Sequence, residues 1–274
     1  MKNLIKLLFL FFQLFMFSCY GQKNVINFNP RYLPDKIYKK NITQMCVIQL
    51  EIQGNKEMLE EIIKNGIENP AIQTEKEREK ILITTGKLSP NHTFPISGKT
   101  ENIENSKLKG IAFKGFCKLG NSPIINSLDS LQLKKDIEQK LILYIEKLLR
   151  ENIISQRKIK IGDSISVVSP LINYSTENLN IDLKEATIYY LQKIKGKKVF
   201  FNFTQNYITK AAINKSQFSG NGKGKGILVY DLEKQFIIYS KSSGKVELDS
   251  GNIYPDINFS IKMKFNTKEK NTIK

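Results

Sequence analysis

The feature that most constrains the fold of this chain is a clean alternation of apolar and polar residues near its end. Ile257, Phe259, Ile261, Met263 and Phe265 alternate with Asn258, Ser260, Lys262 and Lys264. Such a strand has one face in an apolar interior and the other in water, as in an antiparallel sheet. Similar runs recur from Lys158 onward between turn signals. The second half of the chain is therefore predicted to be nearly all strand and turn.

Two hairpins are predicted in this half. Thr187–Ile194 and Val199–Tyr207 flank a Lys-Gly-Lys turn at residues 195–197. Ile227–Tyr230 and Phe236–Tyr239 flank a second turn at residues 231–234. No parallel βαβ rhythm is visible, which disfavours the α/β class of enzyme folds.

Helical spacing occurs in two segments. The longer runs from Leu131 to Glu151, and Asp129 or Ser130 can cap its start. Its apolar positions are Leu133, Ile137, Leu141, Tyr144, Ile145 and Leu148. The shorter segment, Lys56 to Lys64, has Asn55 as its cap and Gly66 just past its end, with a strand as the alternative.

These patterns predict an α+β fold that is mostly antiparallel β. We expect a curved meander sheet or half-barrel packed on one long helix. The domain would span residues 41–274, with sub-halves 41–128 and 156–266 joined by the helix at 131–151. A polar segment with Pro90, Pro95 and Gly98 is predicted to be a loop.

The first twenty residues have the layout of an export signal. Lys2 and Lys6 form a basic head, and Leu4 to Phe17 is almost wholly apolar. This run is shorter than the roughly 20 apolar residues that a membrane-spanning helix needs. The layout therefore indicates a cleaved signal peptide.

The residues Met16-Phe17-Ser18-Cys19 resemble the lipobox of lipoproteins of Gram-negative bacteria, although the family has Leu, Val or Ile where Met16 stands. The resemblance implies a signal peptide over residues 1–18, lipidation of Cys19 and a tether over residues 19–40. In the alternative, signal peptidase cuts after Gly21 and the mature chain is soluble. The expected location is the cell envelope, either anchored to the outer membrane or periplasmic, with soluble secretion as the alternative.

The net charge of +17 comes almost entirely from lysine. The 43 basic residues include four arginines, at positions 31, 78, 150 and 157. Nucleic-acid sites favour arginine, whose guanidinium makes bidentate contacts to bases and phosphates. We therefore expect no nucleic-acid partner, while attraction to anionic headgroups or acidic glycans stays open.

Besides Cys19, the chain has Cys46 and Cys117, each on the apolar side of a strand pattern. Two buried free thiols are the favoured interpretation, and a disulfide between them, which an oxidising compartment would permit, is the alternative. No Cys-x-x-Cys motif or His–Cys cluster is present, so no metal site and no cofactor are predicted.

No catalytic residue stands out. His92 is the single histidine, in a polar loop, and the carboxylates Glu75, Glu77 and Glu79 fall on a polar stretch that we expect to be solvated. The run Ser219–Gly226 places glycine at every second position, which does not fit a phosphate-binding loop. Period-two glycine puts these residues on one face of an extended chain, which predicts a bulge, a sharp bend or close approach by another element, such as the helix.

The hairpin of residues 227–239, with the glycine run before it, resembles uncharacterised β-rich envelope proteins and, weakly, the LolA/LolB-like lipoprotein carriers. The carrier resemblance implies an open half-barrel with a helix packed inside. The expected function is that of a non-catalytic envelope lipoprotein, a structural or interaction module with an envelope protein as partner. The alternatives are a carrier of a hydrophobic ligand in the sheet concavity and, less favoured, an envelope hydrolase that uses His92.

Overall fold

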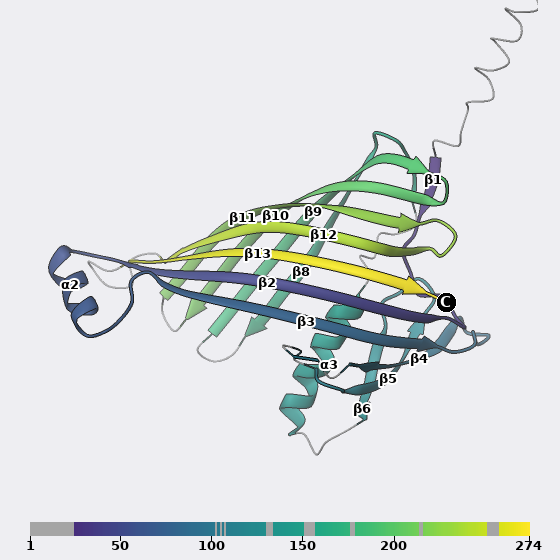
Figure 1. The fold of residues 1–274 in the computed structure, drawn as a ribbon, viewed down its shortest axis with the longest axis horizontal. Helices are drawn as coiled ribbons and strands as arrows, with labels where there is room; N and C mark the ends of the chain where they lie inside the picture. The colour runs from purple at the N-terminus through teal and green to yellow at the C-terminus, as the bar shows by residue number, and fades with distance from the viewer. Residues whose placement is uncertain are drawn as a thin grey trace, which may run out of the picture.

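The computed structural model describes residues 25–101, 103–104, 106, 108–129, 134–150, 157–175, 179–213, 216–250 and 258–274. Within these residues an eleven-stranded antiparallel sheet dominates the fold (Figure 1). Its strands, in spatial order, are β6 (Ile124–Asp129), β5 (Ala112–Lys118), β4 (Thr93–Thr100), β3 (Ala71–Thr85), β2 (Ile37–Gln53), β13 (Asn258–Ile273), β12 (Phe236–Ser250), β11 (Ser216–Asp231), β10 (Lys198–Ile213), β9 (Leu179–Lys195) and β8 (Ser164–Ser175). A two-stranded sheet pairs β1 (Val25–Phe28) with β7 (Arg157–Lys160).

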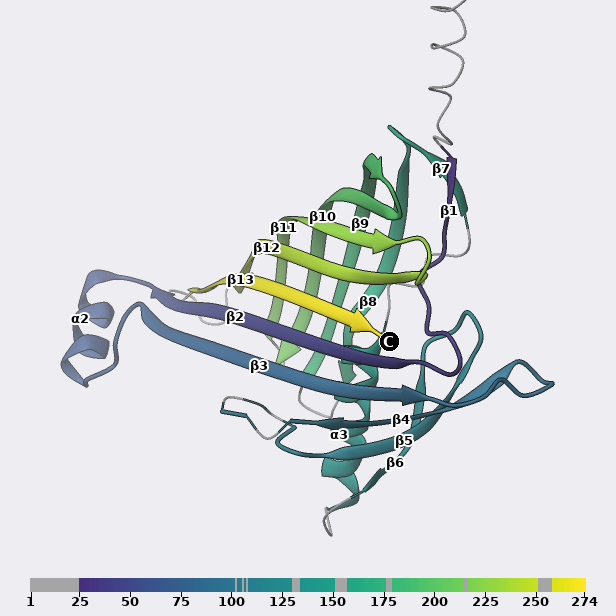
Figure 2. The same ribbon diagram turned by 45° about the vertical axis from the view of Figure 1, so that its right-hand side comes forward.

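The large sheet consists of two meanders that share one border. Strands β2 to β6 run hairpin to hairpin, as do strands β8 to β13, and β13 pairs with β2 along its whole length. The sheet curls strongly, so that β8 and β9 pass behind β2 and β3 at a steep angle (Figures 1 and 2). We call the concave side, which carries Tyr38 of β2 and Phe201 of β10, the inner face, and the opposite side the outer face.

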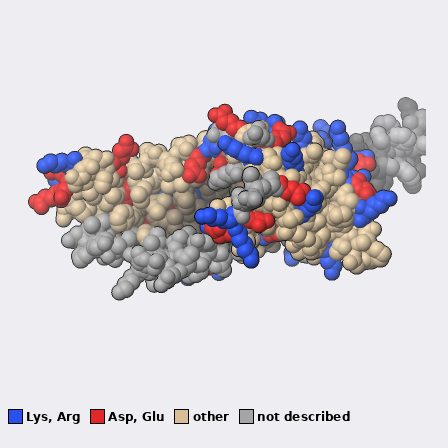
Figure 3. All heavy atoms as spheres, turned by 90° about the horizontal axis from the view of Figure 1, so that it is seen from below, with Lys and Arg blue, Asp and Glu red and all other residues tan. Residues whose placement is uncertain are grey.

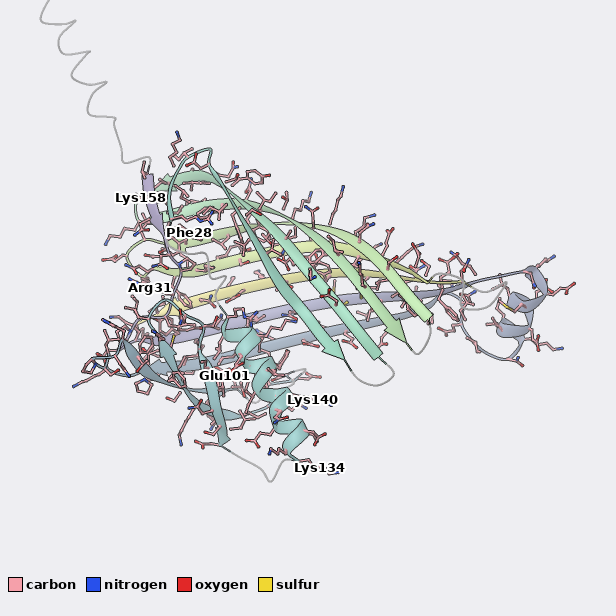
Figure 4. The ribbon with its side chains drawn as sticks, turned by 180° about the vertical axis from the view of Figure 1, so that it is seen from behind. Phe28, Arg31, Glu101, Lys134, Lys140 and Lys158 are labelled. Atoms are coloured by element: carbon pink, nitrogen blue, oxygen red, sulfur yellow. The ribbon has the colours of Figure 1, made fainter. Side chains whose placement is uncertain are left out.

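Two cores fill one end of the inner face. The first joins helix α3 (Lys135–Leu149) to β2–β6, with Ile145 and Leu149 fully buried beside Tyr38. The second packs β1 and β7 against β8–β12, and Phe28 of β1 lies against the rings of Phe201 and Tyr230. Figure 4 shows α3, with Lys134 before its first turn, on the concave side, and Phe28 and Lys158 at the far corner.

The predicted α+β class, a sheet packed on one long helix, is wrong. The described chain is nearly all antiparallel β with two short helices. Helix α3 has 15 residues and begins at Lys135, with Lys134 as N-cap and no side-chain capping bond. Asp129, expected as a cap, ends β6 instead, while Ser130 and Glu151 lie outside the described residues.

The predicted tether of residues 19–40 folds into the domain from Val25 onward. Strand β1 pairs with β7, the Tyr32 side chain is 1% exposed, and β2 begins at Ile37. The N-terminal segment therefore seals both cores. The predicted signal peptide and Cys19 lie outside the described residues.

Several local predictions are confirmed. Helix α2 spans Lys56–Lys64 at the tip of the β2–β3 hairpin, and the Asn55 side chain caps it by accepting from the Met58 N–H. The hairpins β9–β10 and β11–β12 pair as expected. The predicted loop around Pro95 is wrong, because Pro95 and Gly98 lie within β4, opposite Phe116 and Phe113 of β5.

Candidate functional site

Cys46 and Cys117 are both free thiols in the structure. Cys46 is half-buried on β2 and Cys117 is buried on β5, with β3 and β4 between their strands. Burial raises the pKa of the Cys117 thiol to about 11, so it is a poor nucleophile at neutral pH. The disulfide considered from the sequence is therefore absent, and neither thiol has a histidine or metal-site environment.

The polar residues considered for catalysis do not converge. His92 is exposed in the turn between β3 and β4, with a φ of 60°. Glu79, expected in a solvated stretch, is 2% exposed and accepts from the Ser106 hydroxyl, while Glu77 accepts from the Tyr144 hydroxyl of α3. Among the described residues, no three His, Cys, Asp or Glu side chains could hold a metal ion. These carboxylates join β3 to its neighbours.

The space between α3 and the sheet is a packed core, which argues against a ligand cavity there. Lys40 of β2 is 1% exposed, and its Nζ donates to the Leu148 carbonyl at 2.9 Å and pairs with Glu269 at 3.0 Å. The helix is thereby held to the sheet by a buried charged hydrogen bond as well as by apolar contacts, while the ion pair joins β2 to β13. A ligand would therefore have to bind elsewhere on the sheet.

The glycine run lies on the inner face of β11, as its period predicts, and aromatic side chains rather than a helix approach it. A Cβ on Gly226 would lie 2.3 Å from Cζ of Phe203. On neighbouring β12, a Cβ on Gly244 would lie 2.4 Å from Cζ of Phe265. Rings therefore lie across these strands, which lets the sheet curl tightly at its centre.

Beyond the two cores, the inner face carries an apolar patch that we call the distal band. Its members are Cys46, Ile48 and Leu50 of β2, Ile261, Met263 and Phe265 of β13, and Val246 and Leu248 of β12. They form in-register rows, and the β12 and β13 members cluster with Tyr207. The β2 and β13 members stay half-exposed, and Leu50 is 37% exposed. Seen from below, the surface between α2 and the middle of the molecule carries few charges (Figure 3).

The outer face of the same strands is basic. A shallow concavity of about 670 Å³ there is lined by Thr204, Asn206, Lys223, Lys225, Ser243, Lys245, Lys264 and Asn266, together with the residues between them at positions 205, 224, 244 and 265. We call these lysines and their polar neighbours the lysine trough. From the sequence, attraction to anionic headgroups or acidic glycans stayed open, but no particular lysines were indicated for it. The alternation Gly222-Lys223-Gly224-Lys225 could have revealed a lysine face opposite a glycine face.

Comparisons with known proteins give no family. No family model and no curated protein matches the chain. Among solved structures, neisserial surface protein A aligns at 7% identity over 84% of this chain and 96% of its own, with a TM-score of 0.21. Pseudomonas aeruginosa OccK1 aligns at 7% identity over 86% and 99%, with a TM-score of 0.17. These similarities are too weak to assign a fold or a function.

No helix in the described part of the chain is long and apolar enough to cross a bilayer.

Proposed function

We propose that the protein is a non-catalytic lipoprotein of the cell envelope, anchored through Cys19, whose distal band binds the acyl chain of an amphipathic ligand. The observation that carries the proposal is the half-exposed apolar patch on the concave side of the sheet. Large exposed apolar patches on folded proteins mark ligand, membrane or partner sites.

The position of the band within the sheet favours an acyl chain over an added β-strand. Strands β12, β13 and β2 are interior strands, so their backbone groups already pair with neighbours. A ligand there gains only side-chain contacts, which suits a flexible apolar chain. From Cys46 to Leu50 the band runs about 13 Å at the usual rise per residue. One acyl chain spans half of a hydrocarbon core that is about 30 Å thick.

An unpartnered polar atom beside the band supports a ligand with a polar end. The Gln205 side chain donates from Nε2 to Glu185 at 2.8 Å, while its buried Oε1 has no hydrogen-bond partner in the described structure. Gln205 lies in the row that runs through Gly224 and Gly244 to Phe265. If the Gln205 side chain turns towards the concavity, a ligand hydroxyl can donate to this oxygen, which would remove the penalty of leaving it unpaired.

Binding can be measured with N-phenyl-1-naphthylamine, an uncharged apolar dye, displaced by hexadecanol. We expect saturable fluorescence, with affinity reduced about tenfold in Ile48→Gln because a polar group would enter the band. Val47→Gln is the matched control, since it adds the same side chain to the outer face of β2 one residue away. Equal affinity of both variants and the wild type would overturn the distal band as the site.

The anchor is tested separately. The mass of protein from the native membrane fraction should correspond to a chain that begins at an acylated Cys19, and globomycin should cause the precursor to accumulate. A mature chain that begins at Gln22 without lipid would refute the anchor and leave the ligand proposal standing.

A further inference from the structure

The lysine trough contains a row of like charges in direct register. Lys223 of β11 faces Lys245 of β12, and Lys245 faces Lys264 of β13. Directly opposite side chains have Cβ atoms about 5 Å apart, and like charges at such positions destabilise a sheet. A row of three lysines therefore works against folding, and an anion bound over it would relieve the repulsion.

The counter-charge for this row is incomplete within the described chain. Lys245 Nζ lies 3.3 Å from a carboxylate oxygen of Glu247, whereas Lys223, Lys225 and Lys264 make no ion pair among the described residues. The trough adds neutral hydrogen-bonding side chains, Thr204, Asn206, Ser243 and Asn266, beside these lysines. Lysine ammonium groups with hydroxyl and amide neighbours are suited to phosphate oxygens.

The basic surface continues along the sheet and is bordered by exposed apolar side chains. A neighbouring hollow adds Lys241, which faces Lys268 across β12 and β13. On the same face, Ile208 of β10 is 57% exposed and Ile227 of β11 is 45% exposed. An extended lysine surface with large apolar side chains at its border suits a headgroup layer better than a single small anion.

We propose that the outer face of β10–β13 docks on a membrane rich in anionic phospholipid, with the lysine trough on the lipid phosphates and Ile208 and Ile227 at the interface. Because the distal band lies on the other face of the same strands, this proposal does not rest on the proposed function. The two surfaces can be tested independently.

The test uses the mature chain with Cys19→Ser, so that no acyl chain contributes, and sedimentation with phosphatidylglycerol vesicles or phosphatidylcholine vesicles. The trough variant is Lys223→Gln/Lys245→Gln/Lys264→Gln. The control, Lys87→Gln/Lys118→Gln/Lys195→Gln, removes equal charge from exposed positions elsewhere. We expect salt-sensitive binding to phosphatidylglycerol vesicles alone, roughly 100-fold weaker in the trough variant. The control should lose less than about threefold, and Ile227→Ser should weaken binding at unchanged net charge.

The proposal is overturned if the wild type does not bind phosphatidylglycerol vesicles. It is also overturned if the two lysine variants lose affinity equally, because net charge alone would then explain the binding. Displacement from the vesicles by inorganic triphosphate, far beyond that by sodium chloride at the same ionic strength, would assign the trough to a soluble anion and overturn membrane docking. Melting temperatures separate loss of binding from loss of fold, because removing the like-charge row should leave the trough variant at least as stable as the wild type.

Discussion

The rings of Tyr207 and Phe265 meet edge to face, with centroids 5.3 Å apart, although β11 and β12 lie between their strands. They can meet because Gly224 of β11 and Gly244 of β12 leave room on the inner face for the two rings, while Val246 packs in the same cluster. This contact holds the curl that makes the inner face concave.

Adding one methyl group beneath this contact should destabilise the fold. In Gly244→Ala the new Cβ would lie 2.4 Å from the Phe265 ring and 3.0 Å from the Lys223 carbonyl oxygen. We expect a loss of about 1–3 kcal/mol in the free energy of unfolding, measured by urea denaturation. Ser243→Ala, the neighbouring residue on the outer face, should change it by less than about 0.5 kcal/mol. Equal stability of the two variants would refute the ring contact as the origin of the curl.

The buried Lys40 ammonium should couple helix α3 to the sheet through the Leu148 carbonyl, and β2 to β13 through Glu269. Lys40→Met removes the cation that faces both Glu269 and the Leu148 carbonyl, and should cost about 3–5 kcal/mol. Adding Glu269→Gln to that variant should restore part of the loss, because the partly buried carboxylate, 23% exposed, is then no longer left without its cation. Additive losses in the double-mutant cycle, measured by urea denaturation, would show that the two side chains do not interact.

The thiols should differ in reactivity towards Ellman's reagent. Burial raises the pKa of Cys117 to about 11. The pKa of the half-buried Cys46 is also raised, by burial and by the charge of Glu75. In the Cys19→Ser chain without reductant, we expect two thiols after denaturation, with Cys117 protected in the native state. Zero thiols after denaturation would demonstrate the disulfide that the structure lacks.

Stability should fall at alkaline pH through Tyr230. Burial is the main cause that raises its pKa to about 12, against an unperturbed value of about 10. The folded state thus favours the neutral phenol, so the stabilisation is complete below pH 10 and is lost as pH rises towards 12. The melting temperature should decline over this window, less steeply in Tyr230→Phe. Identical pH profiles for the two proteins would contradict this origin.

Strands and turns were predictable where the apolar alternation and the turn residues are visible within a short stretch of sequence. The alternation at Ile257–Phe265 and the turn at Gly196 place β13 and the β9–β10 hairpin, because one face of each strand is apolar and the turn needs a positive φ. Helix α2 was predictable from its cap at Asn55. What the sequence did not indicate is strand length. The polar stretches of β2, β3 and β12 pair because their neighbours supply backbone partners, although neither face of these stretches is fully apolar.

The functional surfaces were less predictable for a related reason. The distal band and the lysine trough depend on which residues face one another across β11, β12 and β13, and register is a long-range property. The lysines at 223, 245 and 264 are far apart in the chain and unremarkable one by one. Likewise, the apolar residues of β2 and β13 look like ordinary core residues in the sequence. Only the structure shows that no described element outside the sheet, α3 included, joins their cluster.

The central claim, that the distal band holds an acyl chain, is tested most directly by photolabelling with hexadecanol that carries a diazirine in its chain. Adducts should fall on the inner-face residues of β2 and β13, at positions 46–52 and 259–265, and unlabelled hexadecanol should compete them away. Adducts on the outer face, or scattered labelling that hexadecanol does not reduce, would contradict the account.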